Sequence, residues 1–145
     1  MNATVLVLNG PNLNRLGTRE PEIYGSTTFA ELTEICERHA QVHNLKAVVR
    51  QTNSEAELIG WLHEAADAKT PVVLNPAAFT HYSYAVRDAC SMLTAPLIEV
   101  HISNPAAREE FRHNSVISGV AHGTIAGFGM DSYRMAIEQI ARLNG

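Results

Sequence analysis

The feature that most constrains this chain is a short, unbroken apolar run followed by a long polar loop. Residues from Val5 to Leu8 are all apolar, which is typical of a strand buried on both faces of a parallel sheet. The loop at about residues 10–25 is far longer than the usual connection of about 4–6 residues, and such loops are usually functional or disordered. It lacks the Ser, Gln and Lys composition of a disordered linker. We therefore predict a lid that hinges at its glycines and prolines, an ordered surface loop being the alternative.

Apolar strand patterns alternate with helix patterns along the rest of the chain. Further strands are predicted at 45–51, 71–76 and 96–101, with a fifth inside 116–126. The helices are predicted to begin at a cap among 26–28, at Ser54, after 79–83 and at Asp131. At 145 residues, the chain is predicted to form one α/β domain over 1–145. The expected fold is a flavodoxin-like three-layer sandwich around a five-stranded parallel sheet with strand order 2-1-3-4-5.

Composition excludes several classes of function. Charged residues make up 18% of the chain and hydrophobic residues 46%, as in a soluble globular protein. The net charge of −4 and the lack of a basic run argue against nucleic-acid or anionic-membrane partners. No apolar stretch reaches the roughly eighteen residues of a membrane span. We expect no signal peptide, because the first strand is predicted to begin within the first few residues. Cys36 and Cys90 lie far apart in helical patterns, so we expect reduced thiols and a cytoplasmic protein.

Three patterns that suggest a cofactor or a metal are incomplete. Gly127-Phe128-Gly129 lacks the last glycine of a dinucleotide fingerprint, because residue 132 is Ser. The loop after the first strand contains Pro11 and no nearby hydroxyl, whereas a flavin-phosphate loop needs backbone donors and Ser or Thr. His39 and His43 have the spacing of a metal pair, but no motif supplies a third ligand. We predict neither a cofactor nor a metal, although a flavin-coloured, non-catalytic binding module stays open as the alternative.

Polar side chains follow three of the predicted strands, at 9–24, 75–81 and 101–103. In open parallel sheets, ligands bind beyond the carboxyl ends of the strands, so these clusters are expected to converge. Tyr24 and Arg19 are the most informative pair. A phenol with an ordinary pKa of about 10 is a poor base at neutral pH, but a nearby guanidinium favours the phenolate. From the spacing alone, a Tyr24 that only packs at the start of the next helix is as compatible with the sequence as a catalytic one.

These clusters belong to a longer set of segments that resembles a known family. The segments are Asn9-Gly10-Pro11-Asn12-Leu13-Asn14, Arg19-Glu20-Pro21-x-x-Tyr24-Gly25, Gln51-x-Asn53-x-Glu55, Leu74-Asn75-Pro76, Thr80-His81, Ala85-x-Arg87-Asp88-Ala89, Glu99-Val100-His101-Ile102-Ser103-Asn104 and Arg108-Glu109-Glu110-Phe111-Arg112. With them, the whole chain closely resembles the type II 3-dehydroquinate dehydratases, lyases of the shikimate pathway of aromatic amino acid biosynthesis. The resemblance implies anti elimination of water from 3-dehydroquinate through an enolate, giving 3-dehydroshikimate without a Schiff base.

The resemblance also implies a role for each matching residue. Tyr24 is implied as the base, Arg19 as the group that holds it as phenolate, and His101 as the general acid. Asn12 is implied to orient a water on the enolate oxygen. The implied substrate-binding groups are Asn75, His81 and Arg112 at the ring, the backbone N–H groups of Ile102 and Ser103 at the carboxylate, and Asp88 of a neighbouring subunit. The family implies a homododecamer, a tetramer of trimers.

The lysines give an independent check on this mechanism. A Schiff base needs a desolvated lysine, and the chain has only Lys46 and Lys69 among its eleven cationic residues. Both are predicted in connections that lead into strands, at the end of the sheet opposite the polar clusters. The sequence therefore offers no residue for an imine and favours the enolate route.

Overall fold

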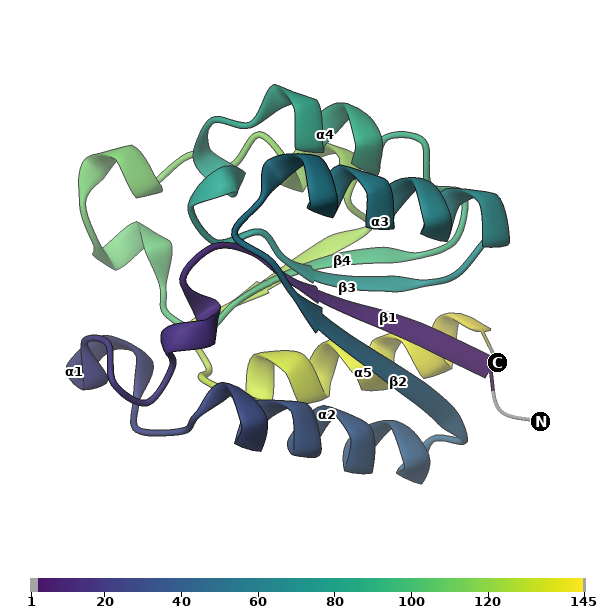
Figure 1. Ribbon diagram of the computed structural model, residues 1–145, viewed down its shortest axis with the longest axis horizontal. Coiled ribbons are helices and arrows are strands. Elements are labelled where there is room, and N and C mark those ends of the chain that lie inside the picture. Colours follow the sequence, from purple (N-terminus) through teal and green to yellow (C-terminus); the bar gives the residue numbers. More distant parts are fainter. Residues whose placement is uncertain (1–2, 145) are drawn as a thin grey trace.

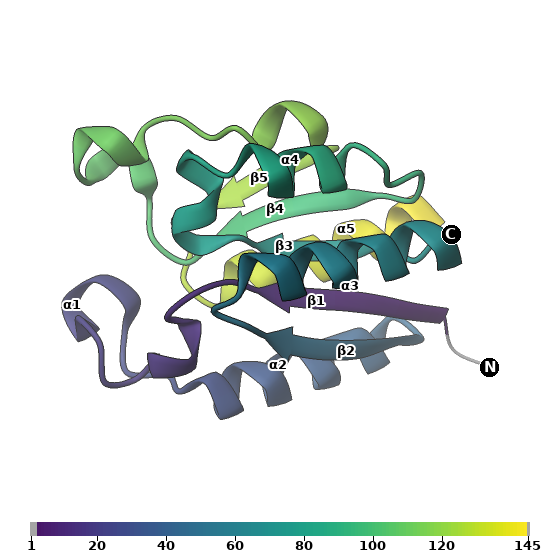
Figure 2. The same cartoon turned by 45° about the horizontal axis from the view of Figure 1, so that its top comes forward.

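The computed structural model describes residues 3–144 and contains one parallel sheet of five strands. The strands are β1 (Ala3–Asn9), β2 (Leu45–Gln51), β3 (Val72–Asn75), β4 (Leu97–His101) and β5 (Gly123–Ala126). Their order in the sheet is β2-β1-β3-β4-β5, and every pairing is parallel. Figure 2 shows this order across the sheet. The predicted α/β class and the strand order 2-1-3-4-5 are confirmed.

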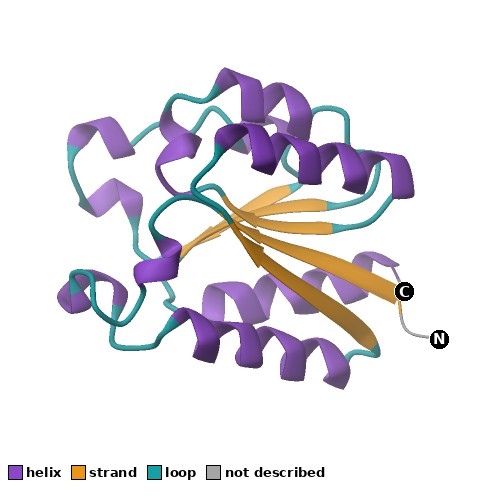
Figure 3. Ribbon diagram, in the orientation of Figure 1, coloured by secondary structure: helices purple, strands orange, loops and turns teal. Residues whose placement is uncertain are grey.

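Two layers of helices cover the sheet. The helices α2 (Phe29–Val42) and α5 (Asp131–Asn144) lie on one face, and α3 (Glu55–Ala68) and α4 (Tyr84–Cys90) lie on the other (Figure 1). Figure 3 shows the sheet as the middle layer. The apolar core is correspondingly divided into two clusters, one on each face of the sheet. The central strands supply side chains to both clusters, which explains the unbroken apolar run at Val5 to Leu8.

Side-chain caps begin three of the helices at the predicted places. Thr28 and Glu31 form a reciprocal capping box at α2, and the hydroxyls of Ser54 and Ser83 cap α3 and α4. The prediction that Asp131 caps the last helix is wrong, because Asp131 is already the first residue of α5. The turn before α5 closes on its own backbone instead, with the N–H of Asp131 donating to the carbonyl of Phe128 at 3.1 Å.

The segment at about 10–25, predicted as one long loop, contains two short helices. A 3-10 helix, η1 (Leu13–Arg15), is followed by one turn of α-helix, α1 (Pro21–Tyr24). Leu13 and Leu16 are buried in the core, so the first half of the segment is anchored to the domain. The second half with α1 projects beyond the carboxyl edge of the sheet (Figure 1).

Two general features of the chain follow from the core and the helices. Cys36 and Cys90 are free, and burial raises the pKa of each thiol to about 12. Both thiols are therefore inert at neutral pH. Within residues 3–144, no helix has the length and apolar character that crossing a membrane requires.

The ends of β1 and β3 touch directly at Gly10. Its N–H donates to the carbonyl of Asn75 at 2.8 Å, and a Cβ added at Gly10 would lie 2.5 Å from the carbonyl oxygen of Pro76. Any side chain here forces the two strand ends apart. Only a glycine allows this approach.

We predict that Gly10→Ala lowers the free energy of unfolding by about 1–3 kcal/mol, the usual effect of overpacking. Gly60→Ala is the matched control, because Gly60 is an exposed position on α3 where a Cβ meets no atom within 4 Å. Gly60→Ala is expected to stabilise the protein by about 0.5–1 kcal/mol through helix propensity. Urea unfolding at one fixed protein concentration measures both. Wild-type stability in Gly10→Ala would contradict the close approach.

Candidate active site

A cavity of about 260 Å³ lies at the carboxyl ends of β1, β3 and β4. Nine of the ten predicted site residues line it: Asn12, Arg19, Tyr24, Asn75, His81, His101, Ile102, Ser103 and Arg112. These residues come from three separate parts of the chain, and the sheet order brings them together because the three strands are neighbours. The exception is Asp88, an exposed residue of α4 that pairs with Arg87 at 3.0 Å and lies outside this cavity.

The end of β2 holds the first part of the lid segment in place. Gln51 donates from its amide to the carbonyl of Gly10 at 3.1 Å, and the side-chain oxygen of Asn53 accepts from the N–H of Asn12 at 2.9 Å. Asn12 has a left-handed backbone with φ of 72°, which asparagine tolerates better than most residues. These bonds fix the position of the Asn12 backbone at the rim of the cavity.

Tyr24 lies between two arginines. The guanidinium of Arg19 sits over the face of its ring, 4.9 Å from the ring centroid. The hydroxyl of Tyr24 bonds to a different residue, because Nη1 of Arg108 donates to it at 2.8 Å. Arg108 also donates to the Oγ of Ser103 at 3.2 Å, so it links the lid to the loop after β4.

Arg108 was not among the predicted site residues. It lies 84 positions from Tyr24 in sequence, and the contact depends on the folded position of α1. The available signal was modest: Arg108 is a cation in the polar connection after the fourth strand, four positions before Arg112. Its guanidinium is also near the carboxylates of Glu20 at 3.9 Å and Glu109 at 3.8 Å.

His101 is held by a buried carboxylate. Its Nε2 lies 2.6 Å from Oε2 of Glu99, which has no exposed surface. The two residues are two positions apart on β4, so their side chains point to the same face of the sheet. Since a carboxylate accepts only, Nε2 carries the hydrogen, and Nδ1 is the nitrogen left for a ligand. Glu99 was also missed as a site residue, although a glutamate within the apolar strand Leu97–His101 is itself a signal.

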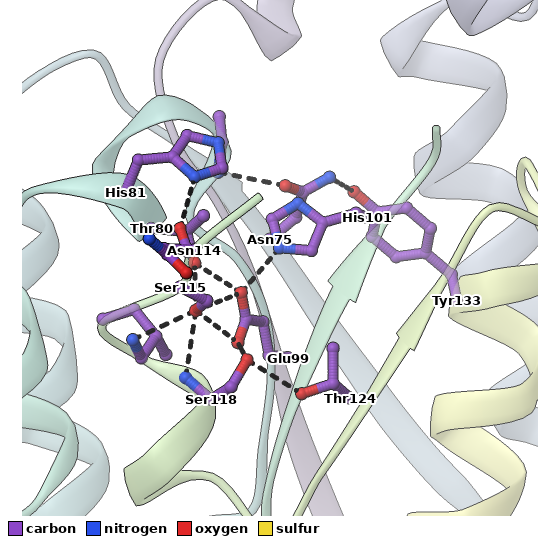
Figure 4. Close-up of polar contacts among 12 residues, drawn as sticks. Asn75, Thr80, His81, Glu99, His101, Asn114, Ser115, Ser118, Thr124 and Tyr133 are labelled. Atoms are coloured by element: carbon purple, nitrogen blue, oxygen red, sulfur yellow. Dashed lines mark hydrogen bonds and ion pairs between the residues drawn. The ribbon is translucent and has the colours of Figure 1, made fainter. Parts of the chain in front are cut away.

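Hydroxyl groups surround the Glu99 carboxylate (Figure 4). Ser118 donates to Oε1 at 2.6 Å, Ser115 lies 3.0 Å from Oε2, and Thr80 donates to Oε2 as well. Burial by itself raises the pKa of Glu99, but the hydrogen bonds from His101, Ser118 and Thr80 outweigh it and hold the pKa below its ordinary value. Glu99 is therefore an ionised group inside the protein.

His81 is a second imidazole at the cavity and is fixed in one tautomer. Its Nδ1 lies 2.8 Å from the carbonyl oxygen of Asn114, so Nδ1 donates and Nε2 is left as an acceptor. Burial lowers the pKa of His81, in spite of the raising effect of that hydrogen bond. A neutral His81 can accept a hydrogen bond from a hydroxyl group in the cavity.

The described residues do not assemble a metal site. The rings of His39 and His43 meet edge to face with centroids 5.0 Å apart on α2. Within residues 3–144, no group of three or more His, Cys, Asp or Glu side chains is placed to hold a metal ion. The contact between the two rings, at the C-terminal end of α2, explains their spacing in the sequence.

A phenol, two imidazoles and three guanidinium groups line one cavity at the carboxyl edge of the sheet, so the fold and the site together define a flavodoxin-like α/β protein with a polar ligand site. A comparison with protein families places it further. The family model described as Dehydroquinase class II matches residues 3–141, and the chain belongs to this family.

Individual relatives agree with the family. The 3-dehydroquinate dehydratase of Salinispora arenicola is 64% identical over 137 residues, which cover 94% of this chain and 96% of the relative. The protein of that name from Mycobacterium tuberculosis is 57% identical over 137 residues, covering 94% and 93%. Among solved structures, the type II dehydroquinase of Propionibacterium acnes superposes with a TM-score of 0.96 at 54% identity, covering 98% of each chain.

The buried carboxylate gives a prediction about stability and pH. The pKa of Glu99 is lower in the folded protein than its ordinary 4.5, so its ionisation stabilises the fold at neutral pH. This contribution is lost as the pH falls from about 4.5 through the lower folded value. Glu99→Gln cannot ionise, and we expect it to be about 1–3 kcal/mol less stable than wild type at neutral pH.

Urea unfolding at a series of pH values measures the effect. The difference between wild type and Glu99→Gln is expected to shrink as the medium becomes acidic. Glu34→Gln is the control, because Glu34 is an exposed partner of Arg38 on α2 and should change stability little at any pH. A difference between wild type and Glu99→Gln that stays constant with pH would show that ionisation of Glu99 does not contribute.

Proposed function

We propose that this chain, as a single domain, converts 3-dehydroquinate to 3-dehydroshikimate by elimination of water in the shikimate pathway. The observation that carries the proposal is the geometry of one cavity. Tyr24, with guanidinium groups at its ring and its hydroxyl, lines the same 260 Å³ space as His101, which is held by a buried carboxylate. A base and an acid facing one small cavity suit an elimination that removes a proton and a hydroxyl group. Relatives named for this reaction support the substrate.

The reaction begins at Tyr24. Its phenolate takes a proton from the carbon next to the ketone, and the electrons of the broken C–H bond move onto the ketone oxygen as an enolate. Arg108 donates to the Tyr24 oxygen at 2.8 Å and Arg19 places its charge over the ring, and both favour the phenolate. Asn12 orients a water that donates to the enolate oxygen, which is stabilisation by a preorganised donor.

His101 completes the elimination. The enolate re-forms the carbonyl, a carbon–carbon double bond forms, and the C–O bond to the leaving hydroxyl breaks. His101 gives a proton to that hydroxyl, which departs as water. Glu99 accepts from Nε2 of His101 at 2.6 Å, so the ring is held with Nδ1 toward the substrate. A neutral His101 and a protonated Tyr24 are left, and transfer of the Tyr24 proton to His101 through solvent resets both groups before the next turnover.

The remaining cavity groups hold the substrate. His81 offers Nε2 as an acceptor to a ring hydroxyl, because its Nδ1 is engaged by Asn114. Arg112 and Asn75 bind further oxygens of the ring, and the backbone N–H groups of Ile102 and Ser103 bind the carboxylate. This division fits a substrate with several hydroxyl groups and one carboxylate.

The positions of the lysines support a route without a Schiff base. Lys46 was predicted in a connection, but it is an exposed residue within β2, where it pairs in register with Thr4 at the end of the sheet opposite the cavity. Lys69 is an exposed residue at the C-terminal end of α3. Neither lines the cavity, and neither is desolvated as an imine-forming lysine must be.

The lid and the assembly are part of the same proposal. Closure of the segment with Arg19 and Tyr24 excludes water and completes the site.

Twelve copies assemble as a tetramer of trimers, in which Asp88 reaches the site of a neighbour. Exposed side chains of Tyr82, Tyr84 and Met92 around α4 are apolar surface available for such a contact. Native mass spectrometry tests this, and a lone 15.8 kDa chain would contradict it. The two free thiols suit the cytoplasm.

The experiment that tests the function is an absorbance assay with 3-dehydroquinate. Wild type is expected to produce the enone absorbance of 3-dehydroshikimate. Tyr24→Phe keeps the ring and removes the base, so its kcat is expected to fall by about 10²–10⁴ or more while the fold survives. Lys46→Ala is the control and should keep wild-type activity. Near-normal turnover in Tyr24→Phe would remove Tyr24 from the role of base, and an inactive wild type would overturn the function.

Borohydride separates the two mechanisms in the same assay. It reduces imines, so a Schiff-base intermediate would leave a covalent adduct that mass spectrometry detects. We expect no adduct when borohydride is added to wild type with substrate.

The two arginines around Tyr24 make a further prediction. Because Arg108 bonds to the Tyr24 oxygen, Arg108→Ala is expected to move the acidic limb of the kcat/KM profile to higher pH. Arg19→Ala should give a smaller shift, because its charge lies over the ring. Activity in both variants should partly recover at high pH.

Lysine at either position should rescue only in part, because an ammonium lacks the planar fork of donors. Ionisable groups in one site share macroscopic titrations, so the profiles are repeated in His101→Ala if its residual activity permits. A uniform loss of activity at every pH, with no movement of the limb, would mean that these arginines act by closing the lid or placing Tyr24.

A further inference from the structure

We propose that Tyr133 is a positioning residue, which acts through its hydroxyl to fix the orientation of the Asn75 side chain at the cavity. Tyr133 lies on α5, on the far side of the sheet from α3 and α4, and has no exposed surface. It does not line the cavity. Its hydroxyl nevertheless reaches the carboxyl ends of both β1 and β3, where it contacts Asn9 and Asn75.

The contacts form a chain of hydrogen bonds whose direction is determined. Asn9 donates from Nδ2 to the carbonyl of Arg50 at 3.1 Å, so its Oδ1 is the atom that faces Tyr133. The hydroxyl of Tyr133 therefore donates to Oδ1 of Asn9, at 2.7 Å. Burial raises the pKa of Tyr133, so the hydroxyl keeps its hydrogen throughout the working pH range.

The same hydroxyl then accepts from Asn75. Nδ2 of Asn75 lies 2.8 Å from the Tyr133 oxygen, and Oδ1 of Asn75 accepts from the N–H of Ala77 at 3.1 Å (Figure 4 shows the Asn75–Tyr133 bond). An amide nitrogen carries two hydrogens, and Tyr133 takes one of them. Asn75 lines the cavity, so its second hydrogen is the group that it offers to a ligand. The chain makes Asn75 a donor and prevents the flip that would present an acceptor.

The backbone at Ala77, which bonds to the Asn75 side chain, is in a strained conformation. Its φ is 52°, a left-handed conformation that alanine rarely adopts. The N–H of Ala77 is tied to Oδ1 of Asn75, and Ala77 itself lines the cavity. Tyr133 therefore stabilises both the Asn75 amide and the strained turn after β3.

This inference rests on the proposed function, and its test is kinetic and structural. Tyr133→Phe keeps the buried ring and removes only the hydroxyl. We expect KM for 3-dehydroquinate to rise about tenfold, with kcat within about threefold of wild type, because a binding group used in ground state and transition state alike is lost. Asn75→Ala should raise KM at least as much. The double variant should show no further rise, because Tyr133 acts through Asn75.

Ser132→Ala is the matched control for stability. Ser132 is fully buried beside Tyr133 and its Oγ accepts from the N–H of Phe128 at 3.2 Å, so the substitution weakens the start of α5 without touching Asn75. Its melting temperature should fall while KM stays at the wild-type value. An unchanged KM in Tyr133→Phe, or a double variant whose effects on KM simply multiply, would overturn the proposal.

Two further measurements keep the test independent of folding and of the proposed function. If Tyr133→Phe does not fold, Asn9→Ala removes the acceptor that orients the hydroxyl, and a wild-type KM there overturns the proposal. If wild type does not dehydrate 3-dehydroquinate, the proposed function is overturned. Crystal structures of wild type and Tyr133→Phe then test the positioning role of Tyr133 by itself. An Asn75 side chain displaced from the N–H of Ala77 in the variant supports the positioning role, and an unmoved side chain overturns it.

Discussion

The contact between the carboxyl ends of β1 and β3 is the constraint on which the rest of the site depends. Gly10 donates to the Asn75 carbonyl at 2.8 Å, and the hydroxyl of Tyr133 joins Asn9 to Asn75 beneath it. Parallel strands are joined by crossover connections, so the loops that leave two neighbouring strand ends run to different parts of the chain. Here the two strand ends are fastened together by glycine packing and amide hydrogen bonds. These contacts fix the relative positions of the two strand ends, which both border the cavity.

Charge in the site is arranged in two separate groups. Glu99 is a buried carboxylate beside His101, and burying a charge costs several kcal/mol unless hydrogen bonds compensate. The hydroxyls of Thr80, Ser115 and Ser118 supply that compensation. On the other side, positive charge dominates around Tyr24. In the proposed mechanism the base and the proton donor belong to different groups, so each has its own electrostatic surroundings.

Much of this was readable from the sequence, because local patterns carry it. The alternation of apolar strands and amphipathic helices predicts a parallel sheet, and the order 2-1-3-4-5 was predicted because it is common at this chain length. Residues that follow strands in a parallel sheet converge at one edge. Arg108 and the hydroxyls around Glu99 were not predicted, since their partners lie far away in sequence and depend on how two loops fold back. Asp131 was misassigned for a related reason: the turn at Gly127 and Gly129 closes on its own backbone, so no cap was required. The roles of the site residues stay predictions.

The bond between Tyr24 and Arg108 joins a projecting segment to the body of the protein, because Tyr24 ends α1 and Arg108 follows β4. In the proposed cycle this bond acts as a latch, and its strength depends on whether the Tyr24 oxygen is ionised. A hydrogen bond to an ionised oxygen is roughly twice as strong as one to a neutral oxygen. The latch is therefore tight while Tyr24 is a phenolate waiting for substrate, and it slackens once Tyr24 has taken the proton. In this proposal the latch weakens while the enolate is still bound and regains its strength when Tyr24 loses that proton before the next turnover, so the hold on the lid changes within each cycle.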